Sequence, residues 1–157
     1  MKRISIVILG FVMVVSSLVA CSNPVVSEYE KFVNIYMVEI NENYEKIIKE
    51  ASVLSGGEET VWISTLENVL IPLCDETLVK INEIQLKTDE VNSLKDKFYN
   101  VISLYKEGFE LLLDGVKNAS EEKLKQGNAK LTEGVKMLEK YNERLEVIGN
   151  YARSRSN

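Results

Sequence analysis

The chain of 157 residues contains no histidine. This absence excludes histidine-dependent catalytic triads, histidine-ligated zinc sites and the side chain that most often acts as a general base near neutral pH. The sequence also has no GxGxxG motif, no Walker-type loop and no EF-hand pattern. We therefore expect a protein that is not an enzyme, with no catalytic residues and no bound cofactor or metal ion.

Adjacent carboxylates are a remaining source of catalytic or metal-binding chemistry. Glu58-Glu59 and Glu121-Glu122 are two such pairs. Side chains that are adjacent in the sequence point to different sides of a helix. Both pairs also lie where helices are expected to begin, and negative charge is favourable there because of the helix dipole. We interpret both pairs as solvated surface charge.

Cysteine occurs only twice, as Cys21 and Cys74. Cys74 lies in the apolar-periodic stretch LIPLCDETL, which favours a small buried side chain over a reactive thiol. If Cys21 is modified, no disulfide can form within the chain. Packing alone must then stabilise the fold.

The first twenty residues have the three parts of a secretory signal peptide. Lys2 and Arg3 are positively charged, residues 4–20 are uncharged, and small residues cluster at the end of that run. The segment Leu18-Val19-Ala20-Cys21 resembles the lipobox of bacterial lipoproteins. The resemblance implies signal recognition through Leu18 and Ala20, covalent diacylglycerol on the sulfur of Cys21, and cleavage before Cys21. Such a protein is anchored by lipid on the outer face of the cytoplasmic membrane or in the cell envelope of a bacterium.

Two other interpretations of this segment compete with lipidation. It could be an ordinary signal peptide that happens to precede a cysteine, or an uncleaved membrane anchor. The uncharged run over residues 4–20 is 17 residues long, which is at the lower limit for a helix that spans a bilayer. Position, flanking charge and cysteine agree best with a lipoprotein.

The charge of the chain restricts its partners. Removing residues 1–20 takes away Lys2 and Arg3 but no acidic residue, which leaves 17 basic and 24 acidic side chains and a net charge of −7. Nucleic acid is therefore not an expected partner, because its phosphates demand a basic surface. The basic pair Arg153 and Arg155 lies near the C-terminus.

Four stretches after residue 26 have helical periodicity. The first begins at Ser27, where Ser27 and Glu30 fit a capping box, and stops at Gly56-Gly57. The second covers residues 60–85 and is interrupted by Pro72, the third follows Thr88 or Asp89, and the fourth follows residues 118–120.

The expected apolar stripe of the second helix is Trp62, Leu66, Val69, Leu73, Ile81 and Ile84. That of the third is Val91, Leu94, Phe98, Val101, Tyr105, Phe109, Leu112 and Val116, and that of the fourth is Leu124, Leu131, Val135, Leu138, Leu145 and Ile148.

These stretches predict an all-α fold, an up-down-up-down four-helix bundle. The alternative is a three-helix bundle in which Pro72 breaks the second segment, since proline either kinks or interrupts a helix. The expected organisation is a signal peptide over residues 1–20, a lipidated tether over 21–26, the helical bundle over 27–150 and a flexible basic tail over 151–157.

The predicted function is binding. We expect a lipid-anchored, non-catalytic module whose partner is a protein or a cell-envelope component such as the cell wall. An even number of helices and a short tether bring the start of the first helix and the end of the fourth to the membrane, where Arg153 and Arg155 would contact lipid. Trp62, Glu58 and Glu59 would then lie at the distal tip as candidate partner contacts. The alternative is a solute-binding or sensing module with a small-molecule pocket between the helices near Pro72.

Overall fold

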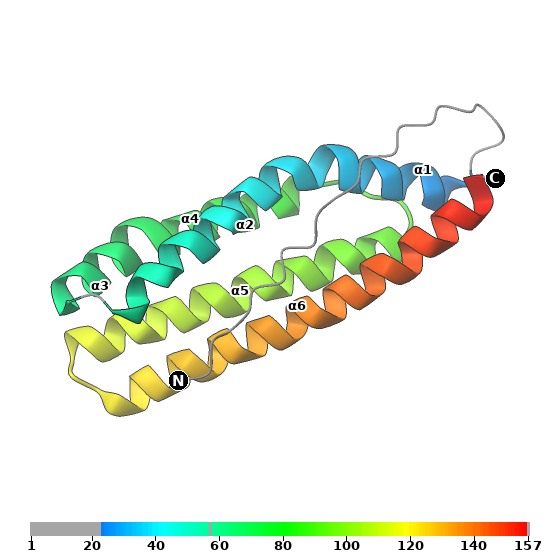
Figure 1. The fold of residues 1–157 in the computed structure, drawn as a ribbon. Helices are drawn as coiled ribbons and strands as arrows, with labels where there is room; N and C mark the ends of the chain where they lie inside the picture. The colour runs from blue at the N-terminus through cyan, green and yellow to red at the C-terminus, as the bar shows by residue number, and fades with distance from the viewer. Residues whose placement is uncertain (1–22, 57, 157) are drawn as a thin grey trace.

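A computed structural model of the chain describes residues 23–56 and 58–156. These residues form four helical rods that run alternately up and down, and none of them forms a strand (Figure 1). The first rod joins α1 (Pro24–Lys31), the π-helical turn η1 (Phe32–Tyr36), α2 (Met37–Ala51) and the 3-10 turn η2 (Ser52–Ser55). The second joins α3 (Glu59–Thr65), the π-helical turn η3 (Leu66–Leu70) and α4 (Ile71–Glu83). The third rod is α5 (Asp89–Lys117) and the fourth is α6 (Glu121–Ser156), so the predicted all-α four-helix bundle is confirmed.

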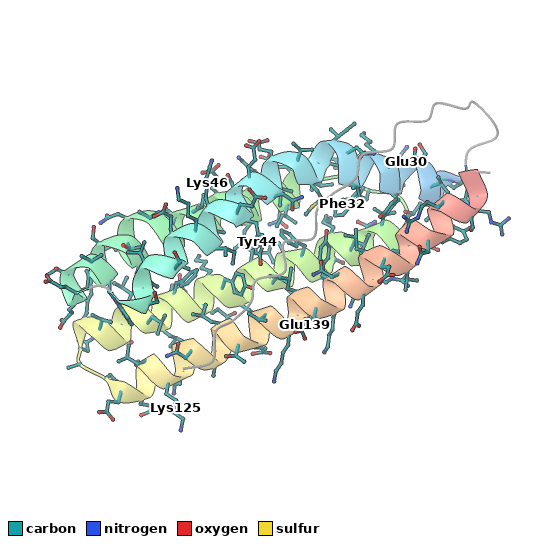
Figure 2. The ribbon with its side chains drawn as sticks, in the orientation of Figure 1. Glu30, Phe32, Tyr44, Lys46, Lys125 and Glu139 are labelled. Atoms are coloured by element: carbon teal, nitrogen blue, oxygen red, sulfur yellow. The ribbon has the colours of Figure 1, made fainter. Side chains whose placement is uncertain are left out.

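The core lies between the rods and is rich in aromatic rings. The Phe98 ring lies 5.7 Å from that of Tyr44 and 5.0 Å from that of Tyr141, measured between centroids. Tyr44 also stacks on Tyr105 at 6.3 Å. Phe32 and Tyr44 point inward, whereas Lys46, Lys125 and Glu139 point to solvent (Figure 2). Each large apolar side chain removed from water in this way stabilises the fold by about 1.5–3 kcal/mol.

The first rod begins three residues earlier than predicted. Asn23 is its N-cap, because its side-chain oxygen accepts a hydrogen bond from the Val25 N–H at 3.0 Å, and Pro24 is a favourable first residue because it lacks an N–H. The predicted capping box at Ser27 and Glu30 is therefore wrong, since both residues lie inside α1. Only Ser22 and Asn23 separate Cys21 from α1.

Pro72 neither breaks the second rod nor divides it into separate helices. In the turn η3, the Ile71 N–H donates to the Leu66 carbonyl, five residues back, in place of the usual four. A wider turn at this point relieves the clash between the proline ring and the carbonyl four residues before it. The second rod thus stays continuous, which rules out the three-helix alternative.

The π turn shifts the buried face of the second rod by one residue. Leu66 is fully buried, as predicted, but beyond it Leu70 and Cys74 are buried where Val69 and Leu73 were expected. Val69 is 36% exposed. A π turn contains one residue more than an α turn, so a stripe counted at 3.6 residues per turn is out of phase after it.

The turn between α5 and α6 places Ala119 in the left-handed region, with φ of 48°. The Ser120 N–H donates to the Gly115 carbonyl at 2.8 Å, and the Ala119 N–H donates to the Val116 carbonyl at 3.3 Å. This pair of bonds is the Schellman motif that often ends a helix, in which the left-handed position usually holds glycine.

Replacing Ala119 by glycine should therefore stabilise the protein. A left-handed conformation costs a residue with a Cβ about 1–2 kcal/mol, and the variant Ala119→Gly removes that cost. We expect the free energy of unfolding to rise by about 1 kcal/mol in urea denaturation. The control Ala129→Gly, at an exposed position inside α6, should lower it by about the same amount. A loss of stability in both variants would contradict the prediction.

The last rod is helical to Ser156, so the predicted flexible tail is wrong for residues 151–156; residue 157 lies outside the described part of the chain. Two contacts order this segment. Ala152 is 3% exposed, and the Asn23 side-chain amide donates to the Tyr151 hydroxyl at 2.7 Å. Val135, which was expected on the apolar stripe of this helix, is instead 48% exposed.

The contact between α5 and α6 relies on glycines that fit opposite large side chains. A methyl group on any of the four glycines at this contact would lie within 3.0 Å of a residue on the opposite helix. The pairs are Gly108 with Leu131, Gly115 with Leu124, Gly127 with Leu112, and Gly134 with Tyr105. Successive pairs are three or four residues apart on each helix, and the two glycines of each helix are seven residues apart, the spacing of an antiparallel coiled coil. At Gly127 the opposing group includes backbone, because the methyl would lie 2.8 Å from the Gly108 carbonyl oxygen.

Candidate functional site

The alternating rods give the bundle two different ends (Figure 1). We call one of them the basal end. It is formed by the start of α1, by residues 84–88 between α4 and α5, and by the end of α6. The distal end is formed by residues 55–56, 58–59 and 117–120. The start of the first rod and the end of the fourth lie at the same end of the bundle, as predicted. The position of either end relative to a membrane remains a prediction.

At the distal end, the predicted contact residues differ in exposure. Glu58 and Glu59 are exposed at the start of α3, and the Glu58 side chain makes no cap bond to this helix. Trp62 is partly buried and packs against the core. Its indole N–H is buried without a hydrogen-bond partner in the described part of the chain. Trp62 thus closes this end of the bundle, and the exposed surface here is mainly acidic.

Ion pairs fix the distal end as one unit. The Lys117 ammonium lies 2.9 Å from the Glu67 carboxylate, which joins the end of α5 to the second rod. The Lys123 ammonium lies 3.4 Å from the Asp114 carboxylate and joins the two sides of the α5–α6 turn. All four side chains are about half exposed, so each pair stabilises the fold by less than about 1 kcal/mol and mainly restricts relative movement.

At the basal end, Glu28 of α1 holds the segment that leads into α5. Its carboxylate accepts hydrogen bonds from the Lys87 N–H at 2.6 Å, from the Thr88 N–H at 2.7 Å and from the Thr88 hydroxyl. Burial raises the pKa of Glu28, but the hydrogen bonds from Thr88 and Lys87 lower it by more, so its pKa is below the ordinary value. Thr88 itself makes no side-chain cap bond to α5.

We expect Glu28→Gln to destabilise the protein by about 1.5 kcal/mol at pH 7, because hydrogen bonds to a charged acceptor are lost. The effect should depend on pH. The ionised carboxylate contributes fully above the ordinary glutamate pKa of about 4.3, and this contribution disappears as the pH falls through the lowered pKa of the folded state. The difference in the free energy of unfolding between the two proteins should therefore shrink as the pH is lowered below the ordinary glutamate pKa. The control Glu30→Gln, two residues along α1 and exposed, should change little. A constant difference between Glu28→Gln and the parent protein at all pH values would contradict this assignment.

Arg153 and Arg155 are both exposed on the last turns of α6, beside the start of α1. The Arg153 guanidinium donates to the Asn150 side-chain oxygen at 2.6 Å. That of Arg155 lies over the Tyr151 ring, 5.7 Å from its centroid. The structure therefore brings these two predicted residues together with Tyr151 on an ordered helix.

The other candidate groups for chemistry are carboxylates on the surface of the rods and the thiol of Cys74. No group of three or more carboxylates and cysteines there is arranged to hold a metal ion. Cys74 is 0% exposed, and burial raises the pKa of its thiol to about 12. Surface carboxylates pair with lysines, as in Lys106 with Asp75 at 2.6 Å and Lys130 with Glu107 at 2.8 Å. The buried thiol therefore belongs to the core, and these carboxylates belong to the charged surface of the bundle.

The region near Pro72 is filled by side chains. Leu70 and Cys74 are fully buried on the core side of the second rod, and Pro72 itself is exposed. Two hollows in the described surface lie elsewhere, on the outer faces of α5 and α6, and both are lined mostly by polar and charged residues. Both of these hollows lie away from Pro72, and the solute-binding alternative remains a prediction.

Sequence reasoning missed Glu28 and the contact between Asn23 and Tyr151. The hydrogen bonds of Glu28 and the bond between Asn23 and Tyr151 join residues 59 or more positions apart in the sequence. No local sequence pattern indicates such a contact. The Asn-Pro pair at residues 23–24 was an available signal for the start of α1.

Leu18, Ala20 and Cys21 lie outside the described residues, so the lipobox remains a prediction from sequence. Within residues 23–56 and 58–156, every helix is too short or too polar to cross a bilayer. No known protein family, no characterised protein and no solved structure matches this chain.

Proposed function

We propose that this chain is a lipid-anchored bacterial lipoprotein that acts outside the cytoplasmic membrane as a non-catalytic binding module. The observation that carries the proposal is the lipobox Leu18-Val19-Ala20-Cys21, which follows an uncharged run and a basic start. The fold is compatible with it, since Asn23 already caps α1 and the anchored residue would be joined almost directly to a bundle.

The fold also supports binding over catalysis. The core is filled by aromatic and aliphatic side chains, and the groups exposed on the rods are mostly charged. A protein or cell-envelope component is the partner that such an elongated surface suits. The acidic distal surface around Glu58 and Glu59 is the proposed contact, because it lies farthest from the anchored end.

The anchor can be tested by intact mass spectrometry of the protein extracted from membranes. We expect a mass that lacks residues 1–20 and includes diacylglycerol on Cys21. An unmodified chain that starts elsewhere, or one that retains residues 1–20, would overturn the proposed anchor.

The contact surface can be tested by photo-crosslinking in cells. A photoreactive residue at Glu59 should give a crosslinked product of defined mass. The same residue at Glu139, which points outward from the middle of α6 (Figure 2), should not give that product. Equal crosslinking at both positions, or none at Glu59, would contradict a distal contact.

A further inference from the structure

The start of α1 and the end of α6 are held together, close to the residue that would carry lipid. An extended residue spans at most about 3.6 Å, so the Cα atoms of Cys21 and Asn23 are separated by no more than about 7 Å. The Asn23 amide in turn donates to the Tyr151 hydroxyl at 2.7 Å. A lipid on Cys21 therefore brings the last turns of α6 to the membrane surface, whatever the direction of the rods.

The groups on those turns are the ones that favour a lipid headgroup layer. Tyr151 is 41% exposed, and tyrosine is enriched at membrane interfaces because its ring is amphipathic. Arg155 lies over the Tyr151 ring, and Arg153 lies between them in the sequence and donates to Asn150, all on the last turns of α6. A guanidinium group binds phosphate with two donors in a fixed geometry, and it remains charged at any physiological pH.

The basal end also carries acidic groups, of which Glu30 and Glu83 are exposed on other rods. In the described part of the chain, neither Arg153 nor Arg155 forms an ion pair with a carboxylate. Glu28 faces the protein and is occupied by Lys87 and Thr88. Asp89 and Glu90 lie in the first turn of α5, where the helix dipole offsets part of their charge. The exposed cations at the end of α6 therefore remain available to an anionic partner.

We propose that Tyr151, Arg153 and Arg155 dock the basal end of the bundle on an anionic lipid surface, so that the rods stand upright on the membrane. The inference rests on the proposed lipid anchor. It adds a second membrane contact, made by the protein itself, which fixes the orientation of the bundle and holds the distal end away from the bilayer.

Spin labels can measure this orientation on the full chain, lipidated and processed in cells and then placed in vesicles. Ser154→Cys reports on the basal end and Ser55→Cys on the distal end; both positions are exposed. Buried Cys74 should not react under native conditions, and the unlabelled parent protein checks this. The vesicles contain either phosphatidylglycerol or only phosphatidylcholine, together with a lipid-bound paramagnetic relaxant.

We expect the relaxant to act on Ser154→Cys more strongly in phosphatidylglycerol vesicles than in phosphatidylcholine vesicles, and to have no effect on Ser55→Cys. High salt should remove the difference between the two lipids, because screening weakens the attraction. Equal relaxation in both lipids would overturn the contact with anionic lipid. Relaxation of Ser55→Cys as strong as that of Ser154→Cys would indicate rods lying flat and would overturn the upright orientation.

The double variant Arg153→Gln/Arg155→Gln tests the side chains. Each arginine near an anionic surface should change the ratio of docked to undocked protein by about fivefold, so the preference for phosphatidylglycerol should fall by roughly 25-fold. The matched control Lys125→Gln/Lys136→Gln removes the same charge from exposed positions farther along α6. An unchanged preference in the arginine variant, or an equal loss in the lysine variant, would overturn the assignment.

Failure of the anchor is distinguishable from failure of this inference. If Cys21 carries no lipid, mass spectrometry shows the unmodified chain and the proposed function fails. If Cys21 carries lipid but the label at residue 154 does not respond to lipid charge, the anchor stands and the docking surface is wrong.

Discussion

Replacing Gly127 by alanine is expected to lower the free energy of unfolding by about 2 kcal/mol, although alanine is the better helix former by about 1 kcal/mol. The new methyl group would lie 2.8 Å from the Gly108 carbonyl oxygen and 2.9 Å from the Leu112 side chain. A flexible side chain can move away, but a carbonyl group inside α5 cannot move without displacing the helix. The rods must therefore separate, with a loss of packing along their contact.

Urea denaturation and a thermal melt measure this effect, and the bulkier Gly127→Leu should cost about 3 kcal/mol or more. Gly56→Ala is the matched control, because a methyl group there has no neighbour within 4 Å. Stabilisation by Gly127→Ala would show that α5 and α6 do not approach so closely.

Replacing Cys21 by alanine is expected to abolish lipid attachment completely, because the thioether requires the cysteine sulfur. Since cleavage follows lipidation, the variant should also retain residues 1–20. Growth with a clickable fatty acid measures the first effect, and the migration of the protein on a gel measures the second.

Cys74→Ala provides the control for the loss of a cysteine. Cys74 is buried in the second rod, so this variant should carry as much fatty acid as the parent protein and should be processed normally. Labelling that persists in Cys21→Ala would place the lipid elsewhere or show that the lipobox resemblance is misleading.

The sequence predicted the third rod best. Seven of the eight residues expected on its stripe, all except Val116, are buried, because α5 is an uninterrupted α-helix and keeps a constant period. In the second rod, Ile81 and Ile84 are buried as expected, and so is Leu66, but Val69 and Leu73, the two expected positions after Leu66, are not. The π turn that follows depends on how the helix accommodates Pro72 within the bundle, and counting residues could not reveal the shift from Val69 to Leu70.

The contacts that the sequence could not predict are those between rods. A glycine such as Gly127 inside a helical pattern usually lowers confidence in the helix; here it is required because the α5 backbone lies against it. The candidate site was predictable only where local chemistry marked it, as in the exposed positions of Glu58, Glu59, Arg153 and Arg155. The two glutamates lie at the distal end and the two arginines at the basal end. This separation could be predicted because an even number of alternating helices brings the first helix start and the last helix end together.

The hydrogen bond between Asn23 and Tyr151 has a consequence for circular permutation. Since residues 23 and 151 are in contact, a short peptide from residue 156 to residue 23 would close the chain, and new termini could be opened at the exposed turn around Gly56. The permuted chain would keep its four rods. A lipobox fused to its new N-terminus would then invert the bundle, with Arg153 and Arg155 facing away from the bilayer.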